Sequence, residues 1–185
     1  MGKRSASVLQ RIRVPLGFAF AALFIVFADP TPALLAGGVS IALVGLLLRA
    51  WSAGHIRKNK EITVSGPYSR TRNPLYLGSF LMGVGFTIAA GVWWLALIFA
   101  VLYLGIYLPV MRIEARELTQ SFGDDYRKYA EEVPLFIPRL TAYADSDRTF
   151  DKNLYLRYRE YQAAIGFAAV TCVLVLKIFL LKYYR

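Results

Sequence analysis

The sequence has little charge and a single cysteine. Only 18% of its 185 residues are charged, whereas about a quarter is usual in a soluble domain. One cysteine, Cys172, excludes an internal disulfide framework, and its apolar surroundings favour the role of a small buried hydrophobe. With 57% hydrophobic residues and a mean hydropathy of +0.45, the composition indicates an integral membrane protein.

Charge is missing altogether from one long stretch. From Asn73 to Met111 there are 39 consecutive residues without Asp, Glu, Lys or Arg. A helix needs roughly 20 apolar residues to cross a ~30 Å hydrocarbon core. The stretch therefore predicts two crossings, with a turn near Gly91 and the Trp93–Trp94 pair in an interfacial aromatic belt.

The other apolar runs complete an all-α, integral membrane helical bundle. We expect a single membrane domain over residues 1–185 with about five transmembrane helices and cytoplasmic amphipathic helices. The expected spans are 14–28, 30–48, 74–90, 92–111 and 161–182, and the expected cytoplasmic segment is 112–160.

The distribution of basic residues orients these spans. Basic residues occur before the first span and again between the second and third spans. They are Lys3, Arg4, Arg11 and Arg13, then Arg49, Arg57, Lys58, Lys60, Arg70 and Arg72. The connections on the opposite side hold Asp29 and no lysine or arginine, so a cytoplasmic amino terminus is predicted. Five spans would then place Lys177 and Lys182 near the outer side, which argues mildly against this count.

The net charge of +10 fits basic loops that face an anionic leaflet, and no nucleic-acid-binding signature accompanies it. We therefore expect the lipid bilayer and a small lipophilic substrate as partners, and no nucleic acid. A basic start followed by a 15-residue apolar run also resembles a signal peptide. The following Asp29-Pro30-Thr31-Pro32 is a poor small-residue cleavage site, which favours a retained span.

The segment that opens the third span carries several signals. Gly66-Pro67 predicts a turn, and Asn73-Pro74 predicts a helix start with asparagine at the cap. Free N–H groups at that terminus favour an anion, and Arg70 and Arg72 add positive charge. Further along, Gly78 and Gly85 share a face on which another backbone or a flat ligand can approach closely.

The segment after the fourth span predicts surface helices. Pro109 is expected to bend or loosen the end of that span. Apolar residues then recur at helical spacing, at Ile113, Leu118, Phe122, Tyr126, Tyr129 and Val133, and Gly123 is expected to divide them into two helices. Glu114 lies on this stripe at the membrane boundary, where a carboxylate needs a partner. That partner is either an arginine or a ligand.

These two segments resemble the integral membrane methyltransferases that include isoprenylcysteine carboxyl methyltransferase and phospholipid N-methyltransferases. The resemblance covers residues 40–140. It rests on Gly66-Pro67-Tyr68, Arg72-Asn73-Pro74-Leu75-Tyr76-Leu77-Gly78, Glu114, Leu118, Phe122-Gly123, Tyr126, Tyr129 and Val133-Pro134, in that order and with one hairpin between.

The resemblance implies S-adenosylmethionine as cofactor, bound at the cytoplasmic ends of the bundle, and a lipophilic acceptor that arrives from the bilayer. The implied cofactor-binding residues are Tyr68, Arg72, Asn73, Tyr76, Leu77, Gly78 and Glu114. The implied catalytic residues are Glu114, Glu132 and Arg139, and no metal is expected. Methyl transfer is an in-line displacement that depends mainly on positioning.

Three departures from the family pattern bear on the substrate. Asn73 replaces the family histidine, Ala115 replaces a second glutamate, and Glu132 stands where the prenylcysteine enzymes have a basic residue. A carboxylate at position 132 repels an anionic acceptor and attracts an ammonium group, so an amine acceptor is our first expectation. Two other functions stay open: a non-catalytic membrane ligand-binding or scaffold protein, and a nicotinamide-dependent membrane reductase.

Overall fold

The computed structural model describes residues 3–57, 61–143 and 148–184. Lys58, Lys60 and residues 144–147 of the expected cytoplasmic segment lie outside these ranges. Within them every regular element is a helix: α1 (Lys3–Phe27), α2 (Pro32–Ala53), the 3-10 turn η1 (Gly66–Ser69), α3 (Pro74–Ala89), α4 (Trp93–Phe122), α5 (Asp124–Glu132), α6 (Lys152–Arg157) and α7 (Tyr161–Tyr184). The all-α prediction is confirmed.

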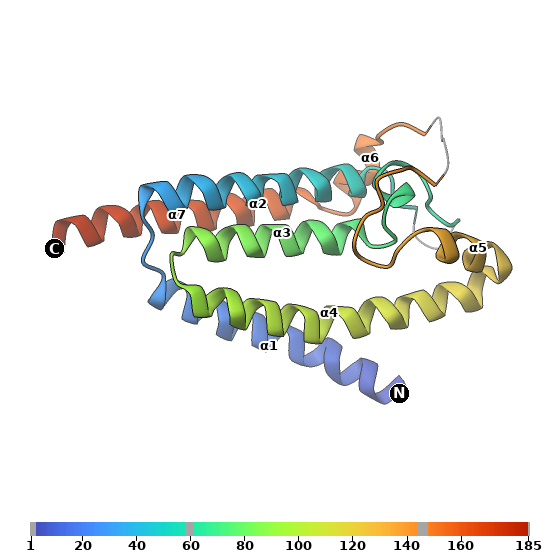
Figure 1. Cartoon of the computed structure of the whole chain (residues 1–185), viewed down its shortest axis with the longest axis horizontal. Helices are drawn as coiled ribbons and strands as arrows, with labels where there is room; N and C mark the ends of the chain where they lie inside the picture. The colour runs from blue at the N-terminus through green and yellow to red at the C-terminus, as the bar shows by residue number, and fades with distance from the viewer. Residues whose placement is uncertain (1–2, 58–60, 144–147, 185) are drawn as a thin grey trace.

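Five of these helices run lengthwise in one bundle, with α2, α3 and α7 on one side and α1 and α4 on the other (Figure 1). Among the described residues, α2, α4 and the Tyr161–Lys182 part of α7 are long and apolar enough to cross a membrane. The apolar part of α1 (Pro15–Phe27) and α3 are shorter. The structure therefore supports a membrane bundle with three clear candidate spans, and the expected number of five is not established.

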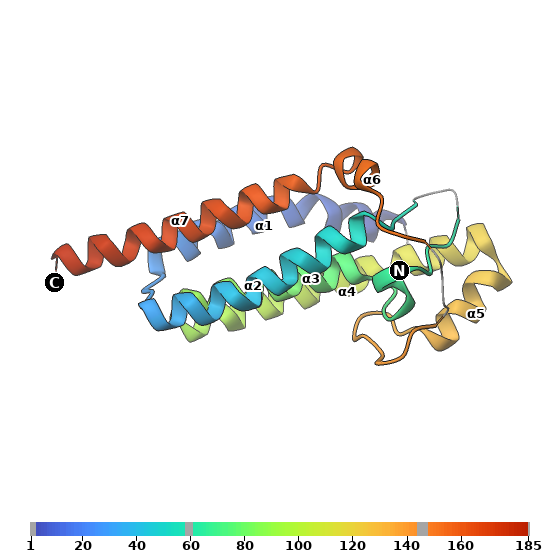
Figure 2. The same cartoon turned by 90° about the horizontal axis from the view of Figure 1, so that it is seen from above.

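The two termini lie at opposite ends of the bundle (Figures 1 and 2). The start of α1 lies at the end that also carries η1, α5 and α6, and α7 ends at the other. All loops that bear the motifs are therefore gathered at one end. We refer to it as the loop end.

The fourth long helix departs from the prediction. It does not stop near Met111 but continues through Pro109 to Phe122, so residues 112–122 extend the span instead of forming a separate surface helix. Proline removes one backbone donor, but the residues that follow include strong helix formers such as Glu114, Ala115 and Leu118, which favour continuation. Gly123, at φ 58°, ends the helix as predicted.

Small residues bring α2 and α3 into backbone contact. A Cβ added to Gly85 would lie 2.4 Å from the amide nitrogen of Ala42 and 2.5 Å from the carbonyl oxygen of Gly38. One added to Gly78 would lie 2.6 Å from the carbonyl oxygen of Gly45. The predicted glycine face is thus confirmed as a helix-packing face, of the kind that drives helix association in membranes.

The carboxyl-terminal helix is tied to the first helix by Lys177. Its ammonium donates to the carbonyl oxygens of Ile25 (2.7 Å), Val26 (2.9 Å) and Ala28 (2.6 Å), at and just after the end of α1, where helix carbonyls lose their intrahelical partners. A cation at a helix carboxyl end also complements the helix dipole. Lys177 therefore has a structural partner, which explains how a lysine is tolerated in an apolar helix.

The apolar stripe after the fourth span packs against another segment of the chain, whereas we expected it to lie on a surface. Tyr126, Tyr129 and Val133 are buried together, and Ile62 and Val64 of the long connection pack against them. Helix α5 thus covers the chain segment that leads into the motif instead of lying free on a surface. It helps to fix η1 and the start of α3.

Candidate functional site

The start of α3 has the expected boundary but a different role for Asn73. Helix α3 begins at Pro74 with Asn73 in the cap position, yet the Asn73 side chain makes no capping hydrogen bond. Its backbone has ψ 56°, which is outside the extended region that capping residues adopt. Instead its side-chain amide donates to the carbonyl oxygen of Leu135 at 2.9 Å. Asn73 therefore joins the motif to the chain segment after α5.

That segment, residues 134–143, is hydrogen-bonded along residues 69–73. Besides the Asn73 contact, the bonds are Arg72 N to Pro134 O (2.9 Å), Thr71 Oγ1 to Phe136 O (3.0 Å), Arg139 N to Arg70 O (2.9 Å), Arg70 Nη1 to Leu140 O (2.6 Å) and Tyr143 N to Ser69 O (2.9 Å). We call residues 134–143 the latch loop. It fixes the backbone of the motif from outside the bundle.

One turn into α3, Tyr76 meets Glu114 of α4. The Tyr76 hydroxyl donates to Glu114 Oε1 at 2.8 Å, so the two motif segments, 38 residues apart, are joined directly. The hydroxyl of Tyr103 donates to the Tyr76 carbonyl oxygen, and the Tyr107 ring lies 5.4 Å from the Tyr76 ring. Tyr76 is thus held from three sides, and it orients the carboxylate of Glu114.

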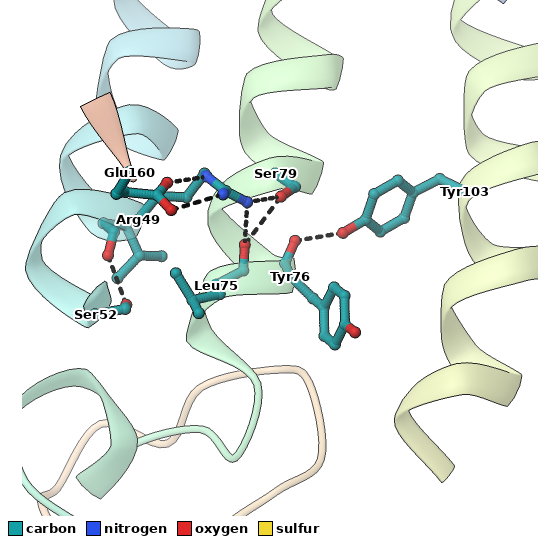
Figure 3. A network of polar contacts seen from close by, with 8 residues as sticks. Arg49, Ser52, Leu75, Tyr76, Ser79, Tyr103 and Glu160 are labelled. Carbon is teal, nitrogen blue, oxygen red and sulfur yellow. Dashed lines mark hydrogen bonds and ion pairs between the residues drawn. The ribbon is translucent and has the colours of Figure 1, made fainter. Parts of the chain in front are cut away.

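On the opposite side of α3, an ion pair connects α2 and α3 to the turn that precedes α7 (Figure 3). Arg49 of α2 binds Glu160 through Nε to Oε1 at 2.6 Å and through Nη2 to Oε2 at 3.0 Å. Its third nitrogen, Nη1, donates to the Leu75 carbonyl oxygen at 3.3 Å and to Ser79. Because the Glu160 side chain is only 9% exposed, this bidentate pair is largely shielded from water. It fixes the residue that precedes Tyr76.

An open pocket of about 390 Å³ lies at the loop end, between the motif and the junction of α4 and α5. It is lined by Arg72, Ala115, Arg116, Thr119, Tyr126, Arg127, Ala130 and Glu131. Ala115, where the family pattern has a glutamate, leaves space here. The lining has three arginines and one glutamate and therefore favours an anionic group. Arg72 Nε is buried and has no hydrogen-bond partner in the described part of the chain.

Tyr68 is the second buried polar group without a partner. Its hydroxyl makes no hydrogen bond within the described ranges, while its carbonyl oxygen accepts from the Tyr129 hydroxyl at 2.7 Å. Burial raises the pKa of both tyrosines, so both hydroxyls stay protonated at neutral pH.

The remaining expected site residues fall into two places. Leu77 is half-buried on α3, and Gly78 is packed against Gly45 and Arg49 of α2. Glu132 and Arg139 lie together, with 3.6 Å between Arg139 Nη1 and Glu132 Oε2. In the described ranges no hydrogen bond or ion pair links either of them to Glu114. The structure thus brings together Tyr76 with Glu114, and Glu132 with Arg139, as two separate pairs.

Sequence reasoning missed Arg49, Glu160 and Tyr103. Arg49 was counted only as a charge at the end of a span, and Glu160 lies outside the motif segments. A usable signal was present: Arg49 ends one apolar run and Glu160 directly precedes another, so opposite charges stand at the same expected boundary. No signal in the sequence selects Tyr103 among the tyrosines of α4.

The chemistry of these groups suits a zwitterion. Arg72 and the pocket arginines can hold a carboxylate, Glu114 can accept from an amine or face a sulfonium, and the Tyr68 hydroxyl offers a further buried donor. Among the described residues, no group of three or more His, Cys, Asp or Glu side chains could hold a metal ion.

Comparison with known proteins supports the resemblance. Residues 40–125 match the family model described as phospholipid methyltransferase. The nickel-cobalt-cadmium resistance protein NccN of Alcaligenes xylosoxydans xylosoxydans is 33% identical over 138 residues, or 74% of this chain and 62% of that protein. The cobalt-zinc-cadmium resistance protein CzcN of Cupriavidus metallidurans is 37% identical over 108 residues, or 57% and 48%.

A third relative carries an enzyme name. The protein-S-isoprenylcysteine O-methyltransferase of Schizosaccharomyces pombe is 27% identical over 142 residues, or 74% of this chain and 60% of that protein. The chain thus spans about half to three fifths of the length of these relatives. No solved structure matches it. Residues 40–125, which carry most of the ordered motifs, thus relate the chain to the phospholipid methyltransferases, and the distant similarity to the isoprenylcysteine enzyme supports the same relationship.

Proposed function

We propose that the protein is an S-adenosylmethionine-dependent methyltransferase that acts at the cytoplasmic membrane face on a small lipophilic acceptor. The observation that carries this proposal is the 2.8 Å hydrogen bond from Tyr76 to Glu114. It joins the two motif segments that the family resemblance assigns to the cofactor. The basic content of the loop end supports its cytoplasmic location.

The side chains of the chain itself would bind and orient the reactants. When bound, S-adenosylmethionine supplies an electrophilic methyl group on a positively charged sulfur. Glu114, fixed by Tyr76, presents a carboxylate to positive groups, and Arg72 presents a guanidinium to a carboxylate. Holding the two reactants in line is the main contribution that such a transfer requires.

The pair of Glu132 and Arg139 bears on the acceptor. The Arg139 guanidinium also donates to Thr141 and to the Glu132 carbonyl oxygen, and its side chain is 28% exposed. The Glu132 side chain is 61% exposed, so its carboxylate is the more accessible of the two charges. We therefore keep an amine head group as the first expectation for the acceptor, and an isoprenyl-type carboxylate as the other.

Binding of S-adenosylhomocysteine to the detergent-solubilised protein tests the cofactor assignment. Glu114→Gln should weaken binding by about ten- to a hundred-fold, since a lost charge-assisted hydrogen bond costs about 1.5–3 kcal/mol. Glu117→Gln is the matched control, because Glu117 is an exposed carboxylate on the same helix. Equal affinity of Glu114→Gln and the parent would contradict the assignment.

The competing function is ligand binding without turnover, which the small Ala115 in place of a family glutamate favours. Incubation with labelled S-adenosylmethionine and a membrane lipid extract separates the two. We expect label in an amino lipid fraction. S-adenosylhomocysteine binding without any labelled lipid would instead support the non-catalytic function, and binding of a nicotinamide dinucleotide alone would support a reductase.

A further inference from the structure

The latch loop carries the most exposed apolar side chains outside the long helices in the described part of the chain. Ile137 is 76% exposed and Leu140 is 91% exposed. In contrast, Phe136, directly before Ile137, is half-buried, with its ring 5.7 Å from the ring of Phe80. The loop thus turns one aromatic side chain towards the bundle and leaves two large aliphatic ones uncovered.

The height of the loop follows from the Phe136 contact. Phe80 lies six residues after Pro74, which is ~9 Å along a helix at 1.5 Å per residue. The loop therefore lies beside the first two turns of α3, where the 39-residue charge-free stretch begins. Figures 1 and 2 show it at this level at the loop end, and in Figure 2 it projects sideways from the bundle. This is the expected level of the membrane boundary.

Many backbone polar groups of the latch loop are hydrogen-bonded within the protein, as a poorly hydrated environment requires. The carbonyl oxygens of Pro134, Leu135, Phe136 and Leu140 accept hydrogen bonds from residues 70–73, and the N–H groups of Arg139 and Tyr143 donate to residues 69 and 70. Irregular backbone that enters a membrane must have its polar groups paired, because lipid offers no substitute. The latch loop meets this requirement at six groups.

Positive charge flanks the exposed aliphatic residues. Arg70 is exposed, and no ion pair of Arg70 is found in the described ranges, while its Nη1 holds the Leu140 carbonyl oxygen. Arg139 is balanced by Glu132 at 3.6 Å. The loop therefore presents two exposed aliphatic side chains beside the positive charge of Arg70, which suits the anionic surface of a cytoplasmic leaflet.

We propose that the latch loop is a lipid-binding element. Ile137 and Leu140 insert into the boundary between head groups and acyl chains, and Arg70 contacts the phosphates of anionic lipids. The same loop holds Asn73 and Arg72, so its attachment to the leaflet sets the height of the candidate site relative to the bilayer. The inference rests on exposure, charge and hydrogen bonding and does not depend on methyl transfer.

Depth-dependent quenching tests the insertion. In a Cys172→Ala background, Ile137→Cys, Leu140→Cys and the control Lys128→Cys, an exposed site on α5, are each labelled with an environment-sensitive fluorophore. The full chain is reconstituted in phosphatidylglycerol vesicles that contain acyl-chain spin-labelled lipid. We expect the labels at 137 and 140 to be quenched at least three-fold more than the label at 128.

Two further measurements define the outcome. Arg70→Gln should reduce quenching of the label at position 140 in phosphatidylglycerol vesicles and leave it unchanged in phosphatidylcholine vesicles. Quenching at 137 and 140 equal to that at 128 would overturn the insertion. Protection from an aqueous quencher without quenching by lipid would assign the patch to contact between copies of the chain and would also overturn it.

Discussion

The two faces of α3 pack by different means. Towards α2 the contact is made by glycine, and backbone atoms of the two helices approach each other directly at Gly85 and Gly78. Towards α4 it is made by aromatic rings: Phe80 lies 5.9 Å from Phe99 and 5.3 Å from Tyr103. Backbone cannot yield without separating the helices, whereas rings can rotate. The α2 face is therefore a rigid support, and the α4 face, where Tyr76 binds Glu114 of α4, can adjust.

We expect the largest loss of stability from a substitution that removes the ion pair of the rigid face at the loop end. Glu160→Ala removes the partner of Arg49 and leaves its guanidinium shielded with two unmatched donors. Loss of one partner from a buried pair costs about 3–5 kcal/mol, and Arg49 is 23% exposed, so we expect about 3 kcal/mol. Thermal unfolding in detergent measures it.

The double variant Arg49→Met, Glu160→Leu is the matched control for this prediction. It removes both charges and should recover most of the loss, because an apolar pair of similar volume often replaces a buried ion pair without penalty. A double variant less stable than Glu160→Ala would show that the links from Arg49 to Leu75 and Ser79 stabilise more than the ion pair does.

A graded series of glycine substitutions compares the two faces directly. Gly85→Ala should destabilise by about 2–3 kcal/mol, because its Cβ would meet backbone atoms of α2. Gly83→Ala should cost about 1 kcal/mol, since the atoms nearest to its Cβ would belong to the ring of Phe99, which can rotate away. Gly105→Ala on α4 meets nothing within 4 Å and should stabilise by up to about 1 kcal/mol.

The order of these three variants is the result that matters. Chemical or thermal unfolding of all three in one detergent gives the ranking. If Gly83→Ala proved as damaging as Gly85→Ala, the aromatic face would be as rigid as the glycine face, and the contrast between them would be lost.

The third prediction addresses the adjustable face at the site. Tyr76→Phe removes the donor that orients Glu114 and should weaken S-adenosylhomocysteine binding about ten-fold, or about 1.4 kcal/mol. Tyr107→Phe is its control, because Tyr107 contributes ring contacts to Tyr76 and Tyr103. Calorimetric titration in detergent gives both affinities. A similar loss in both variants would indicate that removal of any hydroxyl from this tyrosine cluster weakens binding, and that the hydrogen bond to Glu114 has no special role.

The two faces of α3 also differ in how far the sequence could predict them. The glycine face was predictable, since Gly78 and Gly85 are seven residues apart and so share one side of a helix. The helix starts and ends at Pro74 and Gly123 were predictable from local chemistry. The pairing of Tyr76 with Glu114 was only implied, because the family resemblance assigned both residues to one pocket.

Long-range partners were beyond local rules. Arg49 and Glu160 are 111 residues apart, and each alone is explained as a boundary charge. Asn73 satisfied every local criterion for a capping side chain. Its side-chain amide instead donates a hydrogen bond to the carbonyl oxygen of Leu135, 62 residues away. A tertiary contact thus replaced a local one, since the latch loop presents an acceptor where the helix terminus presents only donors.

The smallest expected effect concerns the centre of the aromatic face. Phe80→Leu removes three ring contacts, with Phe99, Tyr103 and Phe136, but leaves a side chain that neighbouring rings can close upon. Aromatic pairs add about 0.5–1.5 kcal/mol beyond the area that they bury, and repacking recovers part of it, so we expect a loss of about 1 kcal/mol. Thermal unfolding of Phe80→Leu beside Phe18→Leu, whose ring is 74% exposed, isolates the packing contribution. Because Phe136 is the latch-loop ring that contacts Phe80, the variant should also loosen that loop, which hydrogen exchange at Arg139 and Tyr143 would detect. A loss as large as that of Gly85→Ala, with unchanged exchange in the loop, would mean that the aromatic face is the rigid one and that the loop is held by its hydrogen bonds alone.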